Sequence, residues 1–153
     1  KNVRVFWAKS PKPEKLMLSF HGIPKEYVEK GDPYEKQCLR TAELLIEKLA
    51  LGEDEWLATF QSRFGRSEWL KPYTDKVLEK LGAEKLTSLD VLSPGFAVDC
   101  LETVGEIGDE GREQFQNAGG GIYNYIPALN ATNAHVEALA EIILERYASN
   151  SHP

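Results

Sequence analysis

The chain has 153 residues and a net charge of −6, because 18 Lys and Arg are set among 24 Asp and Glu. This length fits one compact domain, and a content of 42% apolar residues excludes a disordered chain. The acidic balance argues against a broad phosphate-binding surface, so we expect no nucleic-acid partner. No apolar run approaches the roughly 18 residues of a membrane-spanning helix, and we expect a soluble protein.

Two cysteines, Cys38 and Cys100, stand far apart in the sequence, and neither belongs to a CxxC pair. We therefore expect two buried reduced thiols, no zinc knuckle and no protein-held iron–sulfur cluster. The chain opens on Lys1 and its single methionine is Met17, which suggests a fragment of a longer protein.

Short apolar runs alternate with longer helical patterns along the chain. Residues 1–15, with two prolines and scattered lysines, are interpreted as a lead-in segment, residues 16–148 as one α/β domain and residues 149–153 as a tail. The predicted strands cover residues 16–20, 56–60, 86–92 and 122–126. The predicted helices cover residues 34–51, 74–81, a stretch that begins near 98, and about 132–147.

Helical periodicity predicts which faces of these helices are buried. In the first long helix, apolar residues recur on one face at three- and four-residue steps, and they are Cys38, Ala42, Leu45, Ile46 and Leu49. The last helix is predicted to turn inward four residues, Val136, Leu139, Ile143 and Tyr147. Gly82 is predicted to end the second helix as a left-handed cap.

The alternation of strands and helices predicts a three-layer α/β/α fold with a four-stranded parallel sheet. Ligands of such folds bind outside the carboxyl ends of the strands. The segments after the first three strands, residues 21–24, 61–66 and 93–99, therefore form the candidate site. The glycines at 119–121 precede a strand, so we interpret them as a turn and not as a phosphate-binding loop.

His21 directly follows the first predicted strand. A neutral imidazole in this place can ligate a metal or accept a proton near neutral pH. Gly22 permits the close approach of another segment, and Pro24 stiffens the exit from the strand. A histidine that only hydrogen-bonds a loop carbonyl is the alternative interpretation.

A row of carboxylates follows the third predicted strand. At about 100° per residue the row falls within an arc of roughly 80° on a helix, and its members are Asp99, Glu102, Glu106, Glu110 and Glu113. The like charges and the three glycines among them weaken a regular helix, so an irregular or bulged helix is expected. Such a row can pass a cation or carry protons, and a solvated acidic face is the alternative.

Arg63 and Arg66 follow the second predicted strand, where they could hold an anionic group with a hydrogen bond from Ser62. Trp69 and Phe96 offer flat apolar faces, so a planar dianion would fit this wall. A pair of surface arginines and two core aromatic residues is the alternative interpretation.

Several uncommon strings, in a fixed order, resemble the carboxy-terminal half of a bacterial-type ferrochelatase over residues 16–147. They are Leu18-Ser19-Phe20-His21-Gly22-Ile23-Pro24, Gly31-Asp32-Pro33-Tyr34, Phe60-Gln61-Ser62-Arg63-Phe64-Gly65, Trp69-Leu70-Lys71-Pro72-Tyr73-Thr74-Asp75, Pro94-Gly95-Phe96-Ala97-Val98-Asp99-Cys100-Leu101-Glu102-Thr103 and Ile126-Pro127-Ala128-Leu129-Asn130.

The resemblance implies insertion of Fe²⁺ into protoporphyrin IX to form protohaem, the last step of haem synthesis. It implies that His21 and Glu102 are the catalytic pair, which binds the metal and removes pyrrole protons. It leaves open which of the two takes the protons. It also implies that Asp99, Glu106 and Glu110 are further metal positions along an acidic path.

For the substrate, the resemblance implies that Trp69 and Phe96 line the macrocycle pocket and that Arg63 lies near a propionate, with Ser62 as a further candidate contact. Two pyrrole protons must leave as the metal enters, so an imidazole and a carboxylate on opposite sides of the ring suit the chemistry. Binding energy that bends the ring would expose its lone pairs to the metal.

The family fold has two similar α/β halves, and this chain resembles one of them. The resemblance therefore implies an amino-terminal half as partner, which brings more macrocycle contacts and a membrane-facing lip. It implies that this chain alone does not insert iron at a useful rate. We expect Fe²⁺ as substrate, no permanently bound cofactor, no iron–sulfur cluster and a cytoplasmic location, peripheral to the inner membrane.

Other interpretations stay open on the sequence. A non-catalytic module that binds a metal or a tetrapyrrole, and a cobalt chelatase of the same fold, would both use these residues. A nucleotide-binding or flavodoxin-like protein is disfavoured, because His-Gly-Ile-Pro after the first strand is a poor phosphate loop.

Overall fold

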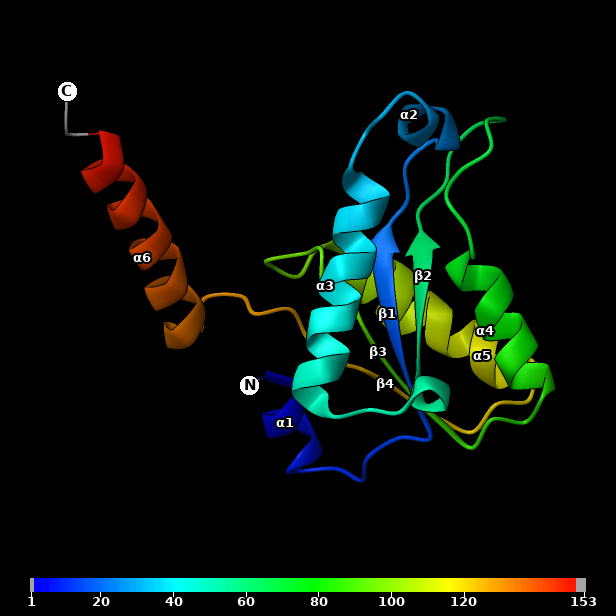
Figure 1. Cartoon of the computed structure of the whole chain (residues 1–153). Coiled ribbons are helices and arrows are strands. Elements are labelled where there is room, and N and C mark those ends of the chain that lie inside the picture. The colour runs from blue at the N-terminus through cyan, green and yellow to red at the C-terminus, as the bar shows by residue number, and fades with distance from the viewer. Residues whose placement is uncertain (1, 151–153) are drawn as a thin grey trace.

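The computed structural model describes residues 2–150 (Figure 1). Strands and helices alternate along it, as the sequence predicts. In chain order the elements are α1 (Asn2–Trp7), β1 (Lys15–His21), α2 (Lys25–Glu29), α3 (Tyr34–Leu49), the short 3₁₀ helix η1 (Glu53–Glu55), β2 (Trp56–Gln61), α4 (Thr74–Ala83), β3 (Ser88–Leu92), the π-helix η2 (Leu101–Glu110), α5 (Gly111–Asn117), β4 (Ile122–Tyr125) and α6 (Asn133–Asn150).

The four strands form one parallel sheet in the order β2-β1-β3-β4. Helices α1 and α3 lie over one face of the sheet, and α4, η2 and α5 lie over the other (Figure 1). The predicted three-layer α/β/α fold is confirmed. Because all strands run in the same direction, the ends of β1, β2 and β3 lie along one edge of the sheet.

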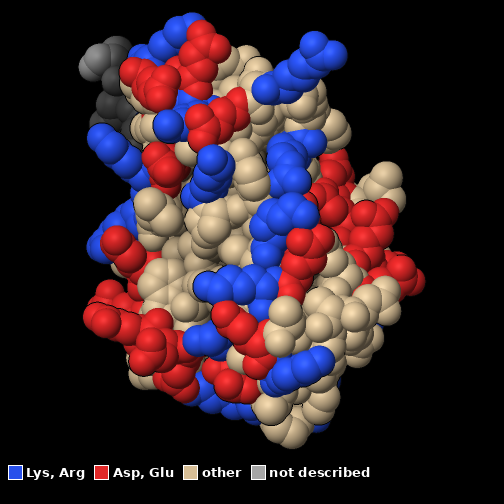
Figure 2. Space-filling view, turned by 90° about the vertical axis from the view of Figure 1, so that its right-hand side faces the viewer, with Lys and Arg blue, Asp and Glu red and all other residues tan. Residues whose placement is uncertain are grey.

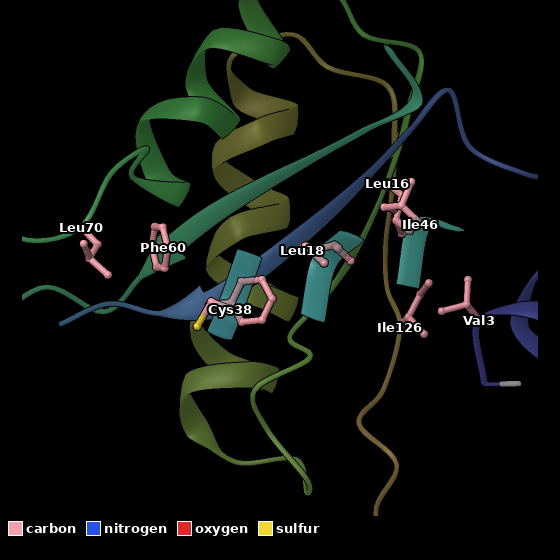
Figure 3. Packing of buried hydrophobic residues seen from close by; sticks show 10 residues of the cluster. Val3, Leu16, Leu18, Cys38, Ile46, Phe60, Leu70 and Ile126 are labelled. Atoms are coloured by element: carbon pink, nitrogen blue, oxygen red, sulfur yellow. The ribbon is translucent and has the colours of Figure 1, made fainter. Parts of the chain in front are cut away.

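The two faces of the sheet carry separate cores. Successive side chains of a strand point to opposite faces, so Leu16 and Leu18 of β1 pack with Cys38 and Ile46 of α3, whereas Met17 packs on the other face. Figure 3 shows the first core, where Val3 of α1 lies beside Ile126. These packed faces hold the strand ends in fixed relative positions.

Helix α1 lies within the segment that we interpreted as a lead-in. Val3 is buried, and the Trp7 indole Nε1 donates a hydrogen bond to Asp90 Oδ2 at 2.8 Å. Asp90 belongs to β3 and is fully buried, and its Oδ1 accepts a hydrogen bond from Asn124 Nδ2 at 2.8 Å. This carboxylate therefore joins α1 to the two strands β3 and β4.

Burial raises the pKa of Asp90 above its usual value, although the hydrogen bonds from Asn124 and Trp7 oppose the shift. A raised pKa in the folded state stabilises the protein below the unfolded-state pKa, and this contribution is lost as the pH rises through the folded-state value. We expect Asp90→Asn to remove this pH-dependent loss of stability, because an amide oxygen accepts the hydrogen bond from Trp7 and the side chain never becomes charged. Urea unfolding from pH 4 to pH 7 should show wild type losing stability relative to Asp90→Asn as the pH rises. Parallel profiles for the two proteins would contradict this prediction.

Helix α6 stands apart from the sheet and its covering helices (Figure 1). The prediction that Val136, Leu139, Ile143 and Tyr147 face inward is wrong, because their exposed fractions are 53%, 47%, 66% and 75%. An apolar pattern indicates that one face of a helix packs against another surface, but it does not identify that surface. In the described part of the chain, no helix combines the length and apolar character needed to cross a membrane.

Gly82 does not cap α4, so that prediction is also wrong. The helix continues to Ala83, and the left-handed residue is Lys85, with φ of 62°. A Cβ atom on Gly82 would lie 2.4 Å from the Phe115 carbonyl oxygen and 2.6 Å from Ala118 Cβ. The glycine is therefore required for the close packing of α4 against α5.

The face formed by α4 and α5 carries both signs of charge, with basic and acidic side chains interleaved (Figure 2). Part of this arrangement is ion pairing within single helices, such as Lys76 with Glu79 at 2.9 Å and Lys80 with Glu84 at 3.8 Å. Exposed pairs of this kind contribute little to stability. Their effect is that neighbouring charges largely offset each other on this face.

Candidate functional site

His21 is the last residue of β1, and it lies beside Gln61, the last residue of β2. Its Nδ1 lies 2.6 Å from the Gly22 carbonyl oxygen, which can only accept a hydrogen bond. Nδ1 therefore carries the proton in this arrangement, and Nε2 of the neutral ring keeps its lone pair. Tyr34 holds the same residue from the other side, since its hydroxyl donates to the His21 carbonyl at 2.8 Å.

Two aromatic residues flank the imidazole. The ring centroids of Trp69 and Phe96 lie 6.4 Å and 6.3 Å from that of His21. The Trp69 segment is held beside the loop after β1 by a backbone hydrogen bond from Leu70 N to Ile23 O, at 3.0 Å. A Cβ atom on Gly22 would lie 3.2 Å from the Trp69 ring, so glycine there permits this close approach, as predicted. His21, Trp69 and Phe96 thus form one cluster, partly exposed to solvent.

The helix predicted to begin near residue 98 begins at Leu101 and is a π-helix up to Glu110. The expectation of an irregular helix is confirmed. It continues directly into α5, and Tyr123 of β4 supports it by donating to the Ile107 carbonyl at 2.7 Å. Cys100, just before it, is only partly buried, unlike the buried Cys38, and both thiols are free. π-helical segments are frequent at functional sites.

Three glutamates of the π-helix, Glu102, Glu106 and Glu110, line a cavity of about 590 Å³ between the β2 exit, α4 and the π-helix. The pKa of Glu102 lies below its usual value because of hydrogen bonding by Cys100 and the backbone. Glu102 is therefore ionised at neutral pH. It lines the cavity, and its backbone carbonyl accepts a hydrogen bond from Gln61, the β2 neighbour of His21, so it connects the two parts of the site.

Asp99 is placed differently from these glutamates. It accepts hydrogen bonds from Tyr125 Oη at 2.7 Å, Asn130 Nδ2 at 2.8 Å, Ala128 N at 3.0 Å and Thr103 Oγ1 at 3.3 Å. Burial opposes ionisation, yet these hydrogen bonds together hold the pKa of Asp99 below its usual value. With both oxygens bonded to the protein, this carboxylate fastens the start of the π-helix to the segment after β4.

The side chains of Ser62 and Arg63, in the loop after β2, already have hydrogen-bond partners within the chain. Ser62 donates its backbone N–H to Glu106 Oε1 at 2.8 Å and its hydroxyl to Glu106 Oε2. Arg63 makes two hydrogen bonds to Asp75, at 3.0 Å and 2.8 Å, and its guanidinium lies 4.2 Å from the centre of the Tyr73 ring. A propionate at Arg63 would therefore compete with Asp75. Arg66 is exposed.

Among residues 2–150, no three His, Cys, Asp or Glu side chains converge into a ready-made metal site. A cation held between His21 and Glu102 would complete its coordination with water or with atoms of a substrate. Such an open arrangement suits an ion that is passed on, since closed sets of four protein ligands are typical of structural metals.

Two residues that sequence reasoning missed are Gln61 and Tyr34. Gln61 is 3% exposed and bonds to the Glu102 carbonyl through Nε2 at 2.6 Å. Gln61 is the first residue of the candidate segment 61–66, directly after a predicted strand, and this position was the available signal. The sequence held no signal for the contact of Tyr34 with His21, because the two residues are separated by the segment that contains α2.

Together, the fold and this site define an α/β protein with a partly exposed imidazole and an acidic cavity at the carboxyl edge of a parallel sheet. The ferrochelatase family model matches residues 1–147. The chain therefore belongs to the ferrochelatase family.

Curated relatives named ferrochelatase agree with this. The chain is 55% identical to one from Thioalkalivibrio sulfidiphilus over 94% of its own length and 39% of the relative. It is 50% identical to one from Marinobacter nauticus, again over 94% of the chain and 39% of the relative. For one from Psychrobacter sp. the values are 52% identity, 97% and 44%. The chain thus spans about two fifths of the length of these relatives.

Proposed function

We propose that this chain forms the carboxy-terminal half of a bacterial-type ferrochelatase, which inserts Fe²⁺ into protoporphyrin IX. The observation that carries the proposal is the placement of His21 and Glu102. An imidazole with a free Nε2 lone pair lies beside two aromatic rings, and Gln61 links its strand to the residue that carries an ionised carboxylate. The family membership of residues 1–147 supports the same chemistry.

In this proposal, the porphyrin lies against Trp69 and Phe96, with its nitrogens near His21. The ring must lose two N–H protons while it gains a divalent cation. His21 Nε2 and the Glu102 carboxylate are bases of moderate strength, so either can accept a proton or coordinate the incoming ion. Glu106 and Glu110 extend the negative charge from Glu102 along the cavity and offer oxygen ligands to a cation in transit.

Asp99 and Arg63 take supporting roles here. Asp99 is proposed to anchor the π-helix, because its oxygens are occupied by four donors. Arg63 would reach a propionate only by exchanging its pair with Asp75, and Ser62 would have to release Glu106. Arg63 and Ser62 are accordingly the weakest of the proposed substrate contacts.

The remaining polypeptide of the longer relatives is proposed to supply the other wall of the cleft. The apolar residues exposed on α6 support this, because a helix with Leu139, Ile143 and Leu144 exposed is suited to packing against further protein. In the same proposal the protein is cytoplasmic, peripheral to the inner membrane, and holds no iron–sulfur cluster or other resident cofactor.

The isolated chain and a hybrid test this proposal. In the hybrid, residues 1–147 replace the matched region of the Thioalkalivibrio sulfidiphilus relative. We expect the hybrid to insert Fe²⁺ into protoporphyrin IX, measured by the absorbance of the product, and the isolated chain to show no useful rate. Robust turnover by residues 1–153 alone would refute the half-cleft proposal. A folded, monodisperse hybrid that inserts Co²⁺ but not Fe²⁺ would favour a cobalt chelatase. A hybrid that binds porphyrin without inserting any metal would favour a binding module.

A further inference from the structure

Gln61 occupies the junction between the two parts of the site. It ends β2 in register with His21, and its backbone carbonyl accepts a hydrogen bond from the Gly22 N–H at 2.8 Å. Its side chain is 3% exposed, and its Nε2 donates to the Glu102 carbonyl at 2.6 Å. Gln61 therefore bonds both to Gly22, next to His21, and to the backbone of Glu102.

The amide of Gln61 is held in one orientation by buried hydroxyl groups. Its Oε1 accepts hydrogen bonds from Ser19 Oγ at 2.8 Å and from Ser93 Oγ at 3.2 Å. Ser19 Oγ also lies 2.9 Å from Thr74 Oγ1, so the set reaches from β1 to α4 and to the end of β3. Because both hydroxyls point at the oxygen, the amide nitrogen must face the π-helix.

Groups outside the π-helix bond to its first turn, namely Gln61 at the Glu102 carbonyl and Asp99 at the Thr103 hydroxyl. Leu101 is 81% exposed and Val104 is 46% exposed, so apolar packing around this turn is sparse. The amide of Gln61 thus ties the Glu102 backbone to the sheet, beside the hydrogen bond from Thr103 to Asp99 that holds the same turn.

We propose that Gln61 is a positioning residue that sets the separation between the His21 imidazole and the Glu102 carboxylate. This inference rests on the proposed function, in which the two groups act on the same metal ion and the same macrocycle. Gln61 touches neither, and it acts through the backbone of Glu102. Groups that orient the ligands of a metal commonly change its affinity 10- to 100-fold when they are replaced.

The test compares Gln61→Met with Ser93→Ala in the 153-residue chain. Methionine matches glutamine in length but cannot donate to the Glu102 carbonyl, whereas Ser93→Ala removes one bond to the same amide and leaves that link in place. Zn²⁺ binding is measured by calorimetry, and His21→Ala identifies the part of the binding that belongs to the site. We expect Gln61→Met to weaken that part at least about tenfold. The Zn²⁺ affinity of Ser93→Ala should stay close to that of wild type, even if Ser93→Ala and Gln61→Met lose similar amounts of stability.

Two structural measurements make the test independent of metal binding. Crystal structures of wild type and Gln61→Met should show the Glu102 carboxylate displaced relative to His21, and amide hydrogen exchange should be faster in the first turn of the π-helix. An unchanged position, within about 0.5 Å, together with unchanged exchange would overturn the proposal for Gln61. If His21→Ala leaves wild-type Zn²⁺ binding unaltered, the metal pair of the proposed function fails, and the two structural measurements still decide the role of Gln61.

Discussion

Replacing His21 by alanine in the hybrid should lower the rate of Fe²⁺ insertion by about 10²- to 10⁴-fold, the range typical for a lost general base. The variant removes the imidazole at the end of β1, whose Nε2 lone pair is free and whose ring lies beside Trp69 and Phe96. Glu102 alone would then have to coordinate the ion and take the protons. The measurement is the initial rate of metalloporphyrin formation at saturating porphyrin, with kcat and KM separated.

The matched control is His135→Ala. His135 is the other histidine within the matched region, and its Nδ1 lies 2.7 Å from the Asn130 carbonyl oxygen, outside the cavity and the aromatic cluster. We expect this variant to insert iron at nearly the wild-type rate. Both histidines are removed from partly exposed positions, so each change should alter the free energy of unfolding by less than about 1 kcal/mol. A His21→Ala hybrid that keeps most of its kcat would contradict the catalytic role of His21.

The sequence predicted the strands and the edge of the sheet well, because buried parallel strands are short apolar runs bounded by polar loops. That pattern placed His21 at the end of β1 and the loop after β2 beside it. It also placed Glu102, Glu106 and Glu110 along one cavity, because residues four apart stay neighbours even where the helix widens into a π-helix.

The position of Asp99 could not be predicted in the same way. Its partner Tyr125 ends β4 and its partners Ala128 and Asn130 follow that strand, and only the folded chain brings them to the start of the π-helix. The acidic row therefore looked uniform in the sequence, although its first member is saturated with donors. Local spacing indicates which side chains share a helix face, but it carries no information about distant hydrogen-bond donors.

Helix α6 and the Arg63 loop show a second limit. The apolar pattern of α6 correctly indicated a helix, yet Val136 and Ile143 are exposed because no surface within the described chain covers them. Arg63 was interpreted as a free cation for an anionic group, but Asp75, twelve residues further on, binds it. In both cases the sequence shows what a residue can do, and the competing partner lies elsewhere in the fold or outside it.

Replacing Phe115 by alanine should produce the largest loss of stability, about 3–5 kcal/mol in the free energy of unfolding. Phe115 is fully buried in α5, its ring centroid lies 5.8 Å from that of Tyr123, and α5 continues the π-helix. The ring also fills space that Gly120 leaves open, since a Cβ there would lie 2.3 Å from Phe115 Cζ. Alanine would leave a cavity under the helix that carries Glu102, and this cavity adds to the lost transfer free energy. Urea unfolding of the chain measures the effect.

The control for Phe115 is Phe64→Ala, because Phe64 is 68% exposed and its removal should change the free energy of unfolding by no more than about 0.5 kcal/mol. A loss near 1 kcal/mol for Phe115→Ala would mean that the α4, α5 and β4 core collapses readily around the missing ring. If the loss is as large as expected, amide exchange in η2 should rise together with that in α5. The position of the glutamates would then depend on a core residue that touches none of them.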